Sequence, residues 1–130
     1  MCKNKILTGV LSLFNIAVLL AQADVNITGT ASYYHQKFNG RKTANGEIFH
    51  NDSLTAAHKT LPFGTLVKVT DLKNKSWIIV RINDRLPATS KRAIDLSQAA
   101  AKELKMIESG LAKVSIELLQ KDSLREISRE

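Results

Sequence analysis

The stretch Trp77–Pro87, WIIVRINDRLP, decides the fold of this chain. Residues 77–82 are rich in β-branched side chains, which suit a strand. We expect this strand to break at residues 83–87, because Asn and Asp favour turns and Pro87 cannot donate a ladder hydrogen bond. A rigid strand then presents the Asp84 carboxylate at its end, a place where catalytic groups are often found. The alternative is that Asp84 only caps the turn through its own backbone.

Further strands and one helix are predicted on both sides of this stretch. Alternating or β-branched residues predict strands at 27–34, 65–70, 92–96 and 111–119, and a short apolar run covers 54–58. Ser97 is a suitable N-cap for a helix over 98–105. Residues 35–53 form a long loop with two Asn-Gly turns, and we expect Trp77 in the core. The pattern is typical of a small, mainly β barrel or sandwich with a helix packed on it.

Residues 1–23 have the features of a cleaved signal peptide. Lys3 and Lys5 precede a mostly apolar run over 6–20, and Ala21-Gln22-Ala23 fits a signal peptidase site. A retained membrane anchor is the alternative, but the run is short of the roughly 20 residues that span a bilayer. We therefore expect an exported protein, periplasmic or secreted and associated with the cell wall.

The 130 residues suffice for one domain, which we place at 24–119, followed by a charged tail at 120–130. The single cysteine, Cys2, lies in the predicted leader, so the domain has no thiol or disulfide. The formal charge of +7 falls to about +5 without the two leader lysines. This excess favours polyanionic partners such as cell-wall polymers. Nucleic acid is not expected, because no aromatic-plus-basic stacking motif is present.

Three ionisable side chains lie beside predicted turns or strand ends: Glu47, His58 and Asp84. Two carboxylates and a histidine fit acid–base cleavage of a sugar or ester bond. In glycoside cleavage one carboxyl group donates a proton to the leaving oxygen, and a neighbouring group sets its pKa. The simpler alternatives are a salt-bridged Glu47 and a structural His58.

No metal or other cofactor is expected. His35 and His50 do not show the spacing of a ligand pair, and His58 with one carboxylate provides too few ligands for zinc. The chain also lacks the Gly-x-Ser-x-Gly motif of many serine hydrolases. For Asp95 we expect a structural role at the start of the helix.

Tyr33 and Tyr34 are candidates for a sugar-stacking platform. Because successive side chains of a strand point to opposite faces, only one of the two is expected to reach a cleft.

Five motifs, in this order, resemble the rare lipoprotein A (RlpA) family of septal-ring lytic transglycosylases across about residues 28–119. They are Gly29–Tyr34 (GTASYY), Phe38–Glu47 (FNGRKTANGE), Leu54–Gly64 (LTAAHKTLPFG), Val80–Pro87 (VRINDRLP) and Ile94–Ala101 (IDLSQAAA). The resemblance implies a six-stranded double-psi β-barrel with one or two short helices, related to the barwin, expansin and family-45 endoglucanase folds. It also implies cleavage of peptidoglycan glycan strands that are poor in stem peptides.

The resemblance further implies roles for individual residues. Asp84 matches the family's general acid and base, which protonates the glycosidic oxygen and then takes the proton of the muramic C6 hydroxyl as a 1,6-anhydro ring closes. Glu47 and His58 match the residues that position the sugar and tune this acid. The expected substrate contacts are Tyr34, Asn83 and Arg85.

The sequence departs from the family pattern at several points. Leu86 replaces the glycine that usually follows Asn-Asp-Arg, and Tyr33-Tyr34-His35 replaces Trp-Tyr-Gly. A lipid-bearing cysteine after the leader and the family's C-terminal glycan-binding domain are not found in the sequence, so we do not expect a lipid anchor. We also expect a monomer. The alternative function is a non-catalytic, expansin-like module that binds or loosens cell-wall glycan. A third is an inhibitor or partner protein that uses the barrel as a surface.

Overall fold

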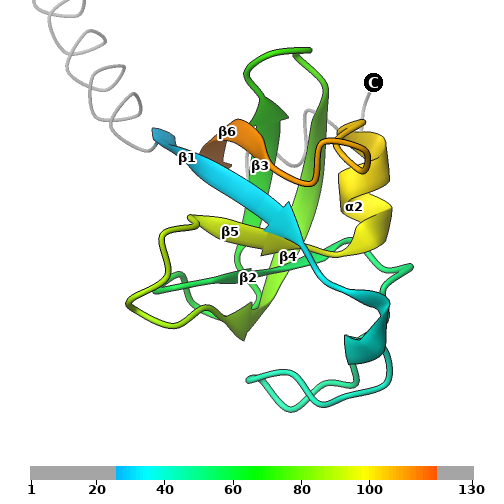
Figure 1. Cartoon of the computed structure of the whole chain (residues 1–130). Helices are drawn as coiled ribbons and strands as arrows, with labels where there is room; N and C mark the ends of the chain where they lie inside the picture. The colour runs from blue at the N-terminus through cyan, green and yellow to red at the C-terminus, as the bar shows by residue number, and fades with distance from the viewer. Residues whose placement is uncertain (1–25, 120–130) are drawn as a thin grey trace, which may run out of the picture.

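The computed structural model of the chain describes residues 26–119 (Figure 1). The predicted signal peptide and the tail at 120–130 lie outside the described residues. Among residues 26–119, no helix is long and apolar enough to cross a membrane.

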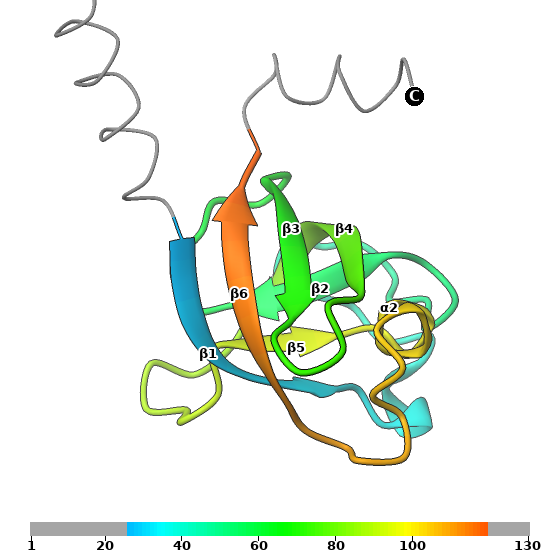
Figure 2. The same ribbon diagram turned by 90° about the horizontal axis from the view of Figure 1, so that it is seen from above.

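Six strands close into a barrel, which is seen from above in Figure 2. They are β1 (Asn26–Tyr33), β2 (Thr55–His58), β3 (Leu66–Asp71), β4 (Trp77–Arg85), β5 (Ile94–Leu96) and β6 (Ala112–Leu118). Their order around the barrel is β1-β5-β2-β4-β3-β6, and antiparallel pairing of β6 with β1 closes it. The β1–β5 and β2–β4 pairs are parallel. The predicted six-stranded barrel is therefore confirmed.

The barrel interior is filled by alternate residues of the longer strands. On β3, Val67 and Val69 are fully buried, and on β4 so are Val80, directly opposite Val67, and Ile82. Burying every second side chain in this way stabilises a closed sheet around one core. The same alternation shows that the expected place of Trp77 in the core was wrong. It occupies an outward position, is 49% exposed, and lies 4.7 Å from the Lys68 ammonium.

Two short helical segments accompany the barrel, η1 (Gln36–Phe38) and α2 (Gln98–Glu103). The Ser97 cap is confirmed, because its hydroxyl oxygen accepts a hydrogen bond from the Ala100 N–H at 3.3 Å. The helix ends two residues earlier than expected, since Lys105 has a left-handed backbone conformation (φ 58°) that cannot continue it.

The expected break after Ile82 was also wrong, because β4 continues to Arg85. Its last residues pair in parallel with β2, and the register moves from Ala56 opposite Ile82 to Ala57 opposite Asp84. Asn83 is therefore the extra residue of a β-bulge.

The bulge decides which way Asp84 faces. Ala56 and Ile82 both belong to the core. The next pair, Ala57 and Asp84, therefore lies on the other face of the sheet, where Ala57 is covered and Asp84 is half-buried. Without the extra residue Asn83, strand alternation would turn Asp84 toward the core.

Candidate active site

The Asp84 carboxylate lies near the end of β4 and is half-buried. Its Oδ1 accepts hydrogen bonds from the backbone N–H groups of Ala44, at 2.8 Å, and Arg85, at 2.9 Å. Its Oδ2 accepts the Tyr34 hydroxyl at 2.5 Å. Donors from three parts of the chain thus fix the orientation of one carboxylate.

Tyr34 follows directly after β1 and is itself held by aromatic contacts. Its ring stacks on Phe49, with centroids 4.4 Å apart, and meets the edge of Phe38 at 5.8 Å. Burial, together with the hydrogen bond to Asp84, raises the pKa of the Tyr34 phenol above its ordinary value. Tyr34 therefore remains a protonated donor. Tyr33 points away, donating its hydroxyl to the Ile107 carbonyl at 2.8 Å, so only one tyrosine of the pair reaches Asp84.

Glu47 forms a two-point ion pair with Arg81. The Nη1–Oε1 distance is 2.6 Å and the Nη2–Oε2 distance is 2.9 Å. Hydrogen bonding to Arg81, and then to Asn45, lowers the pKa of Glu47 from 4.5 to about 2. Glu47 is therefore ionised at neutral pH and cannot serve as the proton donor. The salt bridge of Glu47, which the sequence analysis gave as an alternative, is therefore present.

The loop Thr43–Glu47 joins the surroundings of Glu47 to those of Asp84. Ala44 donates to Asp84, while Asn45 N–H donates to the Asn83 carbonyl at 3.3 Å. The Asn83 amide in turn donates to Glu47 Oε2 at 3.3 Å. Gly46, with φ 91°, allows the tight turn that returns the chain to Glu47. Because Asn83 is only 3% exposed, its role is to hold this loop against β4.

His58 lies on β2, and its Nδ1 is hydrogen-bonded to the following turn. It is 7% exposed, and Nδ1 accepts the backbone N–H groups of Thr60 and Leu61, each at 3.1 Å. Burial lowers the pKa of His58, with smaller effects from Arg85 and Lys59, so the neutral ring carries its proton on Nε2.

The register of β2 explains this placement. His58 pairs with Ile94 on β5, a fully buried core residue, and it follows Ala57, which shares the face of Asp84. Strand alternation therefore puts His58 on the inner face, opposite to Asp84. No hydrogen bond between residues 26–119 joins the ring to Asp84 or Glu47. The hydrogen bonds of one loop bring Asp84, Glu47, Tyr34 and Asn83 together, and the His58 side chain takes no part in these bonds.

The residues that follow Asp84 serve mainly to close the barrel end. Arg85 donates to the His58 carbonyl at 3.3 Å, and its guanidinium lies 4.2 Å from the centroid of the Phe63 ring. Phe63 is 42% exposed, so an aromatic face adjoins the strand end. Leu86, in place of the family glycine, is only 7% exposed and packs into the protein.

Asp95 has a structural role, but not at the helix start. It accepts the Ser32 hydroxyl at 2.6 Å and pairs with Arg92 at 2.7 Å, which ties β1 to β5. The side chains that accept N–H groups at the start of α2 are Ser97 and Asn51, not Asp95. Within residues 26–119, no three His, Cys, Asp or Glu side chains come together as metal ligands do.

Two features of the site were missed in the sequence. Arg81 carries a charge inside an otherwise apolar strand, which was a usable sign of a partner for Glu47. No feature of the sequence indicated the Ala44 N–H as a donor to Asp84, because the position of a backbone N–H group depends on loop geometry alone. A pocket of about 550 Å³ lies between η1 and α2, and none of the predicted site residues lines it.

Comparison with known proteins identifies the family of the chain. A family model described as "Lytic transglycolase" matches residues 26–116. The chain is 55% identical over 100 residues to the endolytic peptidoglycan transglycosylase RlpA of Pasteurella multocida, covering 77% of this chain and 34% of that protein. It is 53% identical over 105 residues to a probable RlpA of Treponema pallidum, covering 80% of this chain and 33% of that protein. The chain thus spans about a third of the length of these curated relatives.

Solved structures show the same barrel. The Streptomyces papain inhibitor matches with a TM-score of 0.59 and 26% identity, covering 73% of this chain and 94% of that one. The apo expansin of Clavibacter michiganensis matches with a TM-score of 0.60 and 18% identity, covering 74% and 51%. These neighbours confirm the double-psi β-barrel.

Proposed function

Because this chain belongs to the RlpA-type lytic transglycolase family, we propose that it cleaves peptidoglycan glycan strands with Asp84 as the proton carrier. The observation that supports this most strongly is the fixed, outward-facing Asp84 carboxylate at the end of β4. A positioned carboxylic acid is the group that glycosidic bond cleavage requires.

Hydrogen bonding indicates which oxygen of Asp84 carries the proton. Oδ1 already accepts two backbone N–H groups, whereas Oδ2 accepts only the Tyr34 hydroxyl. A protonated carboxyl therefore holds its hydrogen on Oδ2, where a lone pair remains for it. Oδ2 is the atom that we assign to proton transfer.

The proposed reaction consumes no water. Asp84 donates its proton to the glycosidic oxygen as the bond from this oxygen to C1 of N-acetylmuramic acid breaks, which releases the 4-hydroxyl group of N-acetylglucosamine. The C6 hydroxyl oxygen of the same muramic residue then bonds to C1, and its proton returns to the Asp84 carboxylate. The products are a 1,6-anhydro-muramic end and a new N-acetylglucosamine end.

The neighbouring residues position this acid. Glu47 and Arg81 hold the loop that supplies the Ala44 N–H, and Tyr34 fixes Oδ2. We propose that His58 is also a positioning residue, because its ring accepts two backbone hydrogen bonds from the turn that leads to Phe63. We also propose that the protein acts after export, as a monomer and without a cofactor. Support for export comes from the leader-like residues 1–23.

The variant Asp84→Asn tests this proposal. It removes the transferable proton and keeps the shape of the side chain. We expect loss of turnover on stem-peptide-free glycan strands, by at least about 100-fold as for a general acid, with retained sedimentation on insoluble glycan. Glu117→Gln, which removes an exposed carboxylate on β6, is the control and should leave turnover unchanged. A wild-type protein that binds glycan as Asp84→Asn does, but releases no product, would instead be a loosening module.

A further inference from the structure

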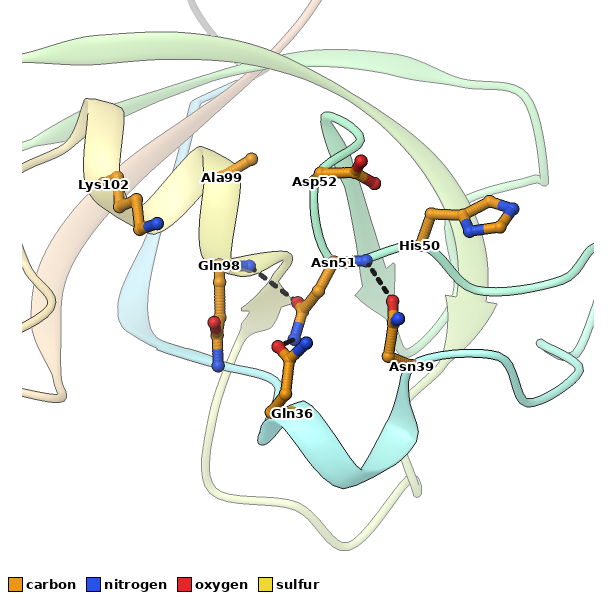
Figure 3. Close-up of a pocket in the computed structure, with 8 residues that line it drawn as sticks. All are labelled: Gln36, Asn39, His50, Asn51, Asp52, Gln98, Ala99 and Lys102. Carbon is orange, nitrogen blue, oxygen red and sulfur yellow. Dashed lines mark hydrogen bonds between the residues drawn. The ribbon is translucent and has the colours of Figure 1, made fainter.

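A polar pocket adjoins the candidate active site through Tyr34. It has a volume of about 550 Å³ and lies between η1, residues 50–52 and the start of α2 (Figure 3). One of its lining side chains, Gln98, donates from Nε2 to the Tyr34 carbonyl at 3.2 Å. The hydroxyl of the same tyrosine donates to Asp84. A single residue therefore separates the wall of the pocket from the proposed proton carrier.

The polar walls of this pocket are fixed by Asn51, which is only 5% exposed. Its backbone N–H donates to Asn39 Oδ1 at 2.8 Å, and its side-chain amide donates to Gln36 Oε1 at 3.0 Å. Its own Oδ1 accepts the Gln98 backbone N–H at 2.9 Å. Figure 3 shows these bonds converging on Asn51 from η1 and α2. Side chains held in this way are ready to bind without first losing conformational freedom.

The chemistry of the walls indicates the class of ligand. The bonds that fix Gln36 and Asn39 use their oxygens, which leaves both NH₂ groups as donors. The amide oxygen of Gln98 is an acceptor. Asp52 and Lys102 add one charge of each sign, so the pocket has little net charge.

Such a mixture fits a neutral group with hydroxyl and acetamido substituents better than an acidic stem peptide. The lining includes the His50 imidazole but no Phe, Tyr or Trp, so we expect a sugar to be held mainly by its polar edge.

We propose that this pocket is a distal subsite, which binds an N-acetylated sugar of the glycan strand outside the bond that is cleaved. The inference rests on the proposed function, because it requires a strand held at Asp84 to continue past Tyr34, the residue that contacts both Asp84 and the pocket wall. It predicts that long strands are processed better than short ones, through binding in this pocket.

Filling the pocket tests the inference. Ala99 lines the pocket from α2, and the variant Ala99→Trp places a large side chain there. The matched control is Glu103→Trp, which lies on the exposed face of the same helix and outside the pocket. With stem-free glycan oligosaccharides, we expect Ala99→Trp to raise KM about 3- to 10-fold for long substrates, as for one or two lost hydrogen bonds. The value of kcat, and the KM of the shortest cleaved oligosaccharide, should stay unchanged. Equal KM values in wild type and Ala99→Trp at every length would overturn the inference.

A second variant and a binding measurement separate this inference from the proposed function. Gln36→Ala removes one amide of the pocket by truncation and should shift KM in the same direction, even if Ala99→Trp does not fold. In Asp84→Asn protein, the same oligosaccharides should shift the side-chain amide NMR signals of Asn51 and Gln98, and Ala99→Trp should abolish these shifts. This result stands whether or not the wild type cleaves glycan. Shifts caused by free stem peptide, and not by sugar, would contradict the assignment.

Discussion

The Tyr34 hydroxyl is the only side-chain donor to the Asp84 carboxylate among the described residues, since the other two donors to its oxygens are backbone N–H groups. The Glu47–Arg81 pair does not contact the Asp84 carboxylate directly. It acts on Asp84 through the loop that carries the Ala44 N–H. Removing the hydroxyl should therefore affect the reaction directly, while removing the ion pair should affect the loop first.

Tyr34→Phe removes this hydroxyl and leaves the ring stacked on Phe49. A hydrogen bond to a charged group contributes about 1.5–3 kcal/mol, so we expect kcat to fall roughly 10- to 100-fold. Stacking is preserved, and KM should change little. Steady-state kinetics on stem-free glycan checks this, and an unchanged kcat would show that Tyr34 does not position Asp84.

The Glu47–Arg81 pair should make stability depend on pH. Because the folded pKa of Glu47 is about 2 and its ordinary value is 4.5, the unfolded chain takes up the proton first as pH falls. The contribution of the pair to the free energy of unfolding is therefore complete above about pH 4.5 and is lost toward pH 2. Both side chains are 39% exposed, so it should be about 1 kcal/mol or less.

Urea unfolding of wild type and Glu47→Gln between pH 2 and 7 measures this contribution. We expect the difference between the two proteins to shrink through this acidic window. A difference that stays constant over the whole range would contradict the assigned ion pair.

Single residues were predictable where their local pattern is unusual. Asp84 and Glu47 stood out as carboxylates next to turns, and strand alternation separated Tyr33 from Tyr34. His58 was chosen by the same logic, but its direction depends on the register of β2 with β5, which no local pattern contains. Trp77 was placed in the core because it is large and apolar, although alternation along β4 turns it outward.

At the scale of elements, the strands and the cap of α2 follow from alternation and from Ser97. The bulge in β4 does not, because Asn-Asp-Arg is typical of a turn when its partner strand is unknown. Parallel pairing with β2 supplies the hydrogen bonds that keep these residues extended. Thus the part of the fold that orients the acid depends on a contact distant in sequence.

The approach of β1 to the segment before β5 gives a prediction at this scale. A Cβ added at Gly29 would lie 2.5 Å from the Ala93 Cβ, too close for either backbone to accommodate without a shift. Gly29→Ala should therefore destabilise the barrel by about 1–3 kcal/mol, the usual cost of overpacking.

Thermal and urea unfolding measure this loss, and the double variant Gly29→Ala, Ala93→Gly provides the control. Removing the Ala93 methyl group should restore most of the lost stability. Failure of the double variant to recover would mean that another contact requires glycine at position 29.

At the scale of the whole molecule, the closed barrel brings together motifs that are far apart in the sequence. The loop 43–47, Tyr34 and the end of β4 come from separate motifs and meet only because β2 pairs with both β4 and β5. The resemblance predicted this barrel as a whole, whereas strand patterns alone left a sandwich equally open. Function at this scale requires both a positioned acid and a path for an extended glycan.

The mass of the products formed by the wild-type protein from stem-peptide-free glycan strands tests the central claim most directly. Cleavage by Asp84 with ring closure predicts products that end in 1,6-anhydro-N-acetylmuramic acid, with no water added. Products that carry one added water, with free reducing ends, would contradict the account and identify a hydrolase.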